Sequence, residues 1–195
     1  MSLMQLITEH EIGVRLGFFF GIFALMAAWE LKAPRRLLNV SKPLRWTNNL
    51  ALVFLNSLAL RLIFPAAAVG VAAFADINHW GLLNHFNLPF ALSVLLSIIA
   101  LDLVIYLQHV MVHAVPTLWR LHRVHHADPD FDVTTGARFH PIEIILSMLI
   151  KFATIVVLGP PIVAVIIFEV VLNAMAMFNH ANVKLPLALD RVLRW

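Results

Sequence analysis

The sequence contains no cysteine and few charged side chains. The absence of cysteine excludes disulfides, thiolate metal sites and cysteine nucleophiles. Only 13% of the 195 residues are Asp, Glu, Lys or Arg, about half the share of an ordinary soluble domain. Such a chain has too little polar surface to cover a soluble core. The net charge of +3 is better suited to loops beside lipid head groups than to nucleic acid, so no nucleic-acid partner is expected.

Apolar residues make up 61% of the chain and gather in runs long enough to cross a bilayer, which takes about 20 residues. The last apolar run is interrupted at Gly159–Pro161, because two prolines after a glycine stop a helix. The sequence predicts one all-α integral membrane domain, residues 1–195, with about four membrane-embedded elements. These are spans at 12–29, 50–75 and 90–108, and a hairpin at 142–178.

The distribution of basic residues predicts the orientation of this multi-pass protein. Loop 32–45 contains five Lys or Arg residues, whereas loop 76–89 contains none. Cytoplasmic loops carry the excess of basic residues in membrane proteins. Loop 32–45 and the polar segment 109–141, which follows the third span, are therefore expected on the cytoplasmic face.

Ten histidines are present, about twice the usual share, and five of them lie between residues 109 and 126. His109 and His113 are four residues apart and share one face of a helix. His122, His125 and His126 are also spaced to cluster on a helix. Three crowded imidazoles repel one another when protonated, so a metal ion is the simplest stabilising partner. Imidazole-rich sites suit iron, copper, nickel and zinc.

Three further residues are candidates for the same site. His180 lies where the apolar hairpin returns, at the same membrane face as the clusters, and is a candidate ligand. His140 precedes the hairpin and is either a ligand or a structural, capping residue. Asp102 lies within the third span, seven residues before His109, and could orient a metal-bound imidazole. The isolated His10, His79 and His85 are read as ordinary surface or hydrogen-bonded residues.

These residues resemble the fatty acid hydroxylase superfamily, which includes sterol desaturases. The family pattern is a histidine pair, then His-x-x-His-His, then an isolated histidine after a hydrophobic hairpin, then a second His-x-x-His-His. His109 and His113 match the pair, and His122, His125 and His126 match the second element. His180 matches the isolated histidine, and the stretch 137–143 is also similar. The resemblance covers roughly residues 45–195.

The resemblance implies an oxidoreductase that hydroxylates or desaturates a membrane lipid. It implies two non-haem irons held by histidines, with O2 as co-substrate. Electrons would come from a redox partner such as a cytochrome b5-like or ferredoxin-like protein, because the chain has no flavin or nicotinamide fingerprint. The substrate could be a sterol, a fatty acyl chain or a related lipid.

The chain departs from the family pattern because the final His-x-x-His-His element is absent before Trp195. We therefore expect the chain to be a piece of a longer protein that binds metal weakly and lacks turnover by itself. Two other functions stay open. One is a membrane zinc hydrolase, although no His-Glu-x-x-His motif provides its general base. The other is a non-catalytic metal-binding fragment.

Overall fold

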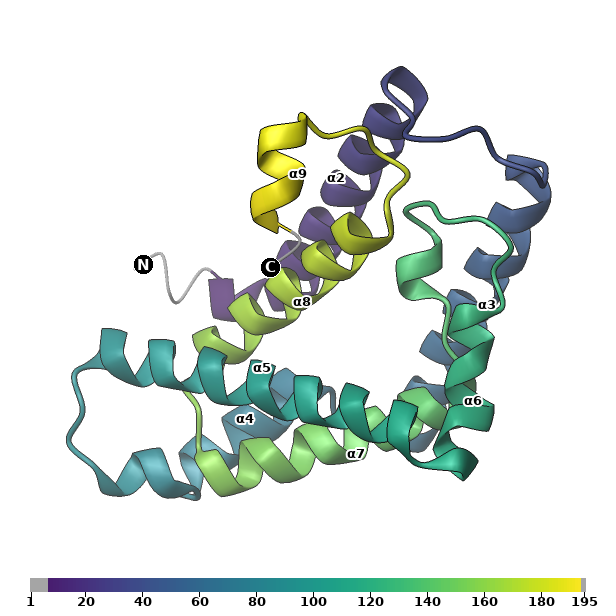
Figure 1. The fold of residues 1–195 in the computed structure, drawn as a ribbon. Coiled ribbons are helices and arrows are strands. Elements are labelled where there is room, and N and C mark those ends of the chain that lie inside the picture. Colours follow the sequence, from purple (N-terminus) through teal and green to yellow (C-terminus); the bar gives the residue numbers. More distant parts are fainter. Residues whose placement is uncertain (1–6, 194–195) are drawn as a thin grey trace.

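The chain folds into a bundle of helices (Figure 1). The computed structural model describes residues 7–193, and this range contains no β-strand beyond an isolated bridge between Pro34 and Val183. The prediction of an all-α fold is confirmed. The helices are α2 (Glu11–Lys32), α3 (Lys42–Ile63), α4 (Ala68–Ile77), α5 (Phe90–Ala114), α6 (Pro116–His126), α7 (Pro141–Leu158), α8 (Ile162–His180) and α9 (Leu187–Leu193), with short 3-10 turns η1 (Leu82–His85) and η2 (Thr135–Ala137).

Five helical segments within residues 7–193 are long and apolar enough to cross a bilayer. Large apolar side chains such as Phe18, Phe54 and Leu95 are exposed on their outer faces. Apolar surface of this extent is stable against lipid, and helices satisfy their own backbone hydrogen bonds there. The protein is therefore an integral membrane protein. The five segments are Glu11–Lys32, Lys42–His85, Phe90–Ala114, Pro141–Leu158 and Ile162–His180.

The second span, expected at 50–75, is longer in the structure and consists of two helices. It starts earlier, because α3 begins at Lys42 with Pro43 in its first turn, a position where the missing N–H costs nothing. It also breaks in the middle, because Pro65 cannot donate a backbone hydrogen bond and restricts the residue before it. Phe64 is accordingly extended, with φ −113° and ψ 117°. The chain then re-enters a helix as α4.

The chain reverses between α7 and α8 at the glycine and two prolines that predict a hairpin tip. Gly159 ends α7 in the left-handed conformation, with φ 65°, and α8 begins directly after Pro161. Gly81 also has a positive φ, and a side chain on it would collide with the backbone of Gly159. The tip of the hairpin is therefore packed directly against the loop between α4 and α5.

Helix α8 is the central element of the bundle. It packs against α2, α4, α5 and the η2 turn, while α7 packs against α3, α4 and α5. The main core lies among α4, α5, α7 and α8 and contains Leu101, Ile155 and Phe168, each at most 1% exposed. A second cluster, which includes Met26, Val133 and Met177, joins α2 and α8 to the loop after α6.

Three charged residues inside the spans form a buried network. The Lys151 ammonium lies 2.9 Å from one oxygen of Glu169, and the Arg15 guanidinium lies 2.9 Å from the other. Glu169 is 4% exposed, so these contacts compensate its removal from water. This network joins α2, α7 and α8.

The loops near the histidines meet at one end of the bundle. The backbone N–H of Arg35 donates to the carbonyl of Asn182, and that of Lys184 donates to the carbonyl of Ala33. Asn39 donates from its backbone N–H to the Asp130 carboxylate at 2.8 Å. Loop 32–45 and segment 109–141 therefore lie at the same end. That this end faces the cytoplasm stays a prediction from the charge pattern.

Candidate metal centre

Two helices bring five histidines together. Helix α5 continues beyond the expected end at residue 108 and carries His109 and His113 in its last turns. Val115 is extended before Pro116, which opens α6 at its first turn. Helix α6 packs back against α5 and carries His122, His125 and His126. The sharp turn at Val115 thus places both histidine groups on facing helix surfaces.

The first group consists of His109, His113 and His122. One ring nitrogen from each lies within 4.8 Å of the others, a spacing that could hold one metal ion. The three ring centroids are 4.8–4.9 Å apart. His122 is fully buried, and its Nε2 has no hydrogen-bond partner. A buried nitrogen without a partner costs free energy unless something binds it, so a cation fits this position.

The second group joins α6 to the end of α8. His125 Nε2 lies 2.9 Å from His180 Nε2. His126 Nε2 lies 3.3 Å from His113 Nε2, and the His126 ring centroid is 5.0 Å from that of His122. The six histidines therefore form one continuous cluster with two foci. One focus is at His109, His113 and His122, and the other is at His125 and His180.

In His125 and His180, the ring nitrogen Nδ1 is fixed by a backbone carbonyl. His125 Nδ1 donates to the carbonyl of Arg138 at 3.1 Å, and His180 Nδ1 donates to the carbonyl of Ala176 at 2.7 Å. Carbonyls only accept, so in both neutral rings Nε2 carries a lone pair rather than a proton. Two lone pairs that face each other at 2.9 Å repel. A metal ion between the rings would convert this repulsion into two coordinate bonds.

The electrostatics of α6 keep its histidines neutral. Burial lowers the pKa of His122 to about 4, with a smaller contribution from repulsion by His113. Burial lowers the pKa of His125 to about 3, and repulsion by His180 adds to the effect. The pKa of His126 is lowered for the same reasons, burial first and neighbouring histidines second. Neutral imidazole is the form that binds metal, so the cluster is ready to coordinate at neutral pH.

A carboxylate does contact a cluster histidine, but it belongs to Glu143 and not to Asp102, the residue expected from the sequence. The Nδ1 of His122 donates to Glu143 Oε1 at 2.7 Å, and Glu143 is 5% exposed. Asp102 is exposed on α5 and makes no hydrogen bond or ion pair with any residue from 7 to 193. Glu143 lies 21 residues from His122, in the first turn of α7, so spacing along the chain gave no sign of this pair.

His140 lies at the N-terminus of α7. Its Nδ1 accepts a hydrogen bond from the backbone N–H of Ile142 at 3.2 Å. This is the capping geometry that was one of its two expected roles. No ring contact joins it to the other histidines in the described range. His79 and His85 lie in the loop between α4 and α5, away from the cluster.

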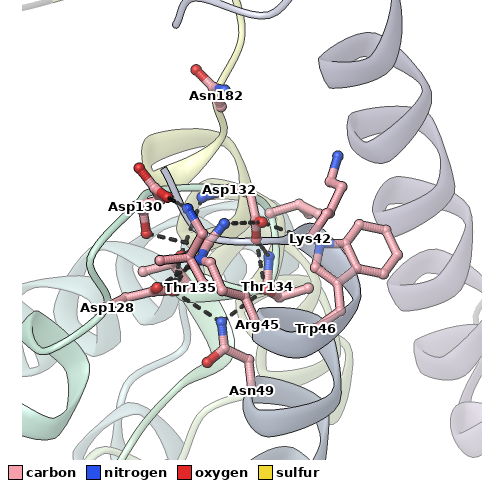
Figure 2. Close-up of polar contacts among 12 residues, drawn as sticks. Lys42, Arg45, Trp46, Asn49, Asp128, Asp130, Asp132, Thr134, Thr135 and Asn182 are labelled. Atoms are coloured by element: carbon pink, nitrogen blue, oxygen red, sulfur yellow. Dashed lines mark hydrogen bonds and ion pairs between the residues drawn. The ribbon is translucent and has the colours of Figure 1, made fainter. Parts of the chain in front are cut away.

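Sequence reasoning missed a buried polar network beside the cluster (Figure 2). Arg45 donates two hydrogen bonds of 2.8 Å to the Asp128 carboxylate and one of 2.6 Å to Asp132. Asn49 and Thr135 also donate to Asp128, at 3.0 and 2.7 Å. We call these five residues the arginine clamp. Burial alone would raise the pKa of Asp128, but the hydrogen bonds from Arg45, Thr135 and Asn49 lower it to about 2.

Hydrogen bonds connect this region to the metal ligands. Arg138 donates to the Asn49 side chain at 3.1 Å, and the Arg138 carbonyl accepts from His125. On the other side, buried Glu30 accepts from the backbone N–H of Val133 at 2.7 Å and of Asn182 at 2.9 Å. Asn182 stands two residues after His180. Polar contacts therefore hold the surroundings of both His125 and His180. Those near His125 lead to α3, and those near His180 lead to α2.

Comparison with known proteins agrees with this site. The chain is 28% identical over 147 residues to the ornithine lipid hydroxylase OlsE of Rhizobium tropici, a match that covers 70% of this chain. The matched part is only 43% of the relative's length. No solved structure matches. The model of the fatty acid hydroxylase family matches residues 94–195, which include all seven candidate ligand histidines. The chain therefore belongs to the fatty acid hydroxylase family.

Proposed function

We propose that this protein is an O2-dependent lipid hydroxylase with a histidine-ligated, non-haem di-iron centre. The observation that carries the proposal is the pair His125 and His180, whose Nε2 atoms face each other at 2.9 Å while both Nδ1 atoms lie within hydrogen-bond distance of backbone carbonyls. The second focus at His109, His113 and His122 supports a second ion. Iron is one of the metals that imidazole ligands suit, and the hydroxylase family favours it over zinc.

When bound, the irons would supply the activation of O2 for attack on a C–H bond. The residues of the chain hold and orient the ligands. The Arg138 and Ala176 carbonyls fix the rings of His125 and His180, and Glu143 fixes His122. His126 contacts His113 and stands between the two foci. The apolar spans keep water from one side of the cluster and offer lipid a lateral approach.

The proposed substrate is a membrane lipid with an amino-acid head group. The support is the name of the relative, which is a hydroxylase of ornithine lipid. The same name favours hydroxylation over desaturation. We further propose that the cluster faces the cytoplasm, because the exposed side chains at this end are mainly basic.

The test is metal analysis of the purified protein followed by turnover with O2, dithionite and ornithine lipid. We expect about two irons per chain and a hydroxylated product. One zinc per chain and no iron would support a zinc enzyme instead. Iron without product from any lipid would support a metal-binding fragment.

A further inference from the structure

Charge is segregated at the end of the bundle that carries the histidine cluster. The acidic side chains Glu30, Asp128, Asp130, Asp132 and Glu143 are each at most 6% exposed and are bound by groups inside the protein. Apart from the buried Arg45, the basic side chains at this end are at least partly exposed. Those exposed at this end are Lys32, Arg35, Arg36, Arg120, Arg123 and Lys184. The surface that surrounds the cluster is therefore positive, although acidic residues are close beneath it.

Two of these basic residues occupy a special position on α6. Arg120 and Arg123 are three residues apart, so they are neighbours on the helix surface. Both are exposed, and neither makes a hydrogen bond or ion pair with any residue from 7 to 193. The same helix carries His122, His125 and His126, and the first two of these are buried. Helix α6 thus presents two unpaired cations outward and metal ligands inward.

The proposed hydroxylation needs electrons from outside the chain. Insertion of one oxygen atom breaks a C–H bond and forms a C–O–H group, and the second oxygen atom leaves as water. The balance is R–H + O2 + 2e⁻ + 2H⁺ → R–OH + H2O. The sequence contains no cysteine to hold an iron–sulfur cluster and no glycine-rich dinucleotide fingerprint. Residues 1–195 therefore hold neither of these electron carriers, and the two electrons must reach the cluster from outside these residues.

We propose that Arg120 and Arg123 form the docking surface for an acidic, one-electron carrier protein. This inference rests on the hydroxylase function proposed above. A carrier bound at this surface is separated from the cluster by the thickness of α6 alone, about 10 Å for a helix with its side chains. Charge complementarity would speed encounter and orient the carrier. Two observations favour a carrier protein over anionic lipid as the partner of these arginines. Helix α6 lies outside the five apolar segments, and only electron transfer requires the partner to be close to the histidines.

The test compares two double charge reversals in the full chain, loaded with iron and held in nanodiscs of neutral phosphatidylcholine. The test variant is Arg120→Glu with Arg123→Glu. The control is Lys184→Glu with Arg191→Glu, which changes the net charge equally at exposed positions away from α6. The probe is a soluble [2Fe–2S] ferredoxin with an acidic surface. Two quantities are measured at low and high salt, namely the Kd of the ferredoxin and the rate at which reduced ferredoxin supports turnover.

We expect the test variant to weaken ferredoxin binding about tenfold or more at low salt and to lose most of its salt dependence. Its turnover with dithionite should match that of the unmodified protein, which shows that the iron site is intact. Arg120→Ala with Arg123→Ala should show the same pattern at smaller amplitude. The control variant should bind ferredoxin within about twofold of the unmodified protein.

Equal loss in both double variants, or no loss in either, overturns the proposal. Hydrogen exchange gives a second test. If phosphatidylglycerol changes the hydrogen exchange of α6 and ferredoxin does not, the proposal is also overturned, because α6 is then a lipid-binding helix. Failure of the hydroxylase function is a separate outcome, since it appears as absence of product with dithionite in the unmodified protein. Ferredoxin affinity is measured without turnover and still decides the docking question.

Discussion

The histidine cluster and the arginine clamp are neighbouring buried sites with opposite hydrogen-bonding states. In the clamp, the Arg45 guanidinium is 3% exposed, and each of its donor nitrogens has an acceptor at 2.6–3.2 Å. In the cluster, the Nε2 of His122 has no hydrogen-bond partner, and the Nε2 atoms of His125 and His180 face each other at 2.9 Å while their Nδ1 atoms face backbone carbonyls. The clamp contains its own cation, whereas the ring nitrogens of the cluster are arranged so that they could hold one.

This difference teaches how a fold can prepare a metal site before metal arrives. An unpaired buried polar group is costly, so neighbouring structure must hold it in place. The clamp ties α3 to the loop that follows α6, and through Asn49 and Arg138 it reaches the carbonyl that orients His125. The satisfied site thus stabilises the geometry of the unsatisfied one.

The largest expected effect comes from removing the cation of the clamp. Arg45→Ala leaves the buried carboxylates of Asp128 and Asp132 without their partner, which should destabilise the protein by about 3–5 kcal/mol. Arg45→Lys should cost less, because it keeps the charge but loses the paired hydrogen bonds. Thermal unfolding in detergent, followed by circular dichroism, measures the loss. Lys184→Ala, at an exposed position, is the control, and a loss for Arg45→Ala no larger than for this control would contradict the account.

Substitution of a cluster histidine should lower the metal content of the protein more than its folding. His125→Ala removes one of the two facing imidazoles, so bound metal should fall by more than the roughly tenfold that loss of a mere supporting group causes. The spans make their own backbone hydrogen bonds, so helix content should be unchanged. Elemental analysis and circular dichroism measure the two properties. His85→Ala should alter neither, and normal metal content in His125→Ala would remove His125 from the ligand set.

Acid should affect the two sites in different pH ranges. In metal-free protein, His122 and His125 have pKa values lowered to about 4 and 3, below the value of about 6.5 in the unfolded chain. The unfolded state therefore binds more protons as pH falls below about 6.5, and the folded state loses stability down to about pH 4. Asp128 has a pKa of about 2, below its unfolded value of about 3.9, so its contribution disappears only below about pH 4.

Denaturant titrations of the metal-free protein between pH 7 and 3 test this order. His125→Gln should flatten the slope between about pH 6.5 and pH 3, the range between the unfolded and folded pKa values of His125, and leave the contribution of Asp128 unchanged. A slope that is the same in His125→Gln and in the unmodified protein would show that the cluster does not govern stability in this range.

Glu143→Gln should have an intermediate effect on metal binding. The amide cannot offer a charged acceptor to His122 Nδ1, so His122 becomes a weaker ligand. Affinity should fall by about 10–100-fold while the side-chain volume is conserved. Competition with a metal chelator measures the affinity. Asp102→Asn is the matched control, since Asp102 touches no histidine, and an equal loss in both variants would return the orienting role to Asp102.

The smallest expected effect belongs to His140. Its Nδ1 caps α7, so His140→Ala should cost about 1 kcal/mol of stability, and His140→Asn should restore most of it. Metal affinity should stay within about twofold in both variants. A loss of metal in His140→Asn, with the cap retained, would make His140 a ligand.

Much of the fold could be predicted because membrane spans depend on local composition. Runs of about 20 apolar residues, and the break at Gly159–Pro161, are visible in the chain itself. The division of the second span was missed although Pro65 was visible, because a proline in a membrane helix can also be accommodated as a kink. The early start of α3 was missed because its first turns are polar, and they are helical through contacts with a distant loop.

For the candidate site, spacing identified the histidines but not their partners. His109 and His113, or His122 and His125, share a helix face through the period of the helix alone. The contacts of His122 with Glu143 and of Arg45 with Asp128 join residues 21 and 83 positions apart. Such pairs depend on how helices pack, and a single sequence carries no periodic signal for that. Asp102 was chosen because it is a carboxylate inside the third span, seven residues before His109 on the same helix face, but in the structure it makes no hydrogen bond to a histidine.

The close approach of Gly81 and Gly159 has a consequence for the biogenesis of the protein. Loop 78–89 leaves the ribosome well before the hairpin of α7 and α8, so it reaches its membrane side first. The hairpin tip must then pack against a loop that is already in place. The backbones of the tip and the loop can touch only because Gly159 and Gly81 have no side chains. This contact fixes the position of the hairpin tip, and with it that of α7 and α8, relative to the loop between α4 and α5. A bulkier residue at position 81 would displace the hairpin tip, and the error would be carried along α8 to His180 at its other end.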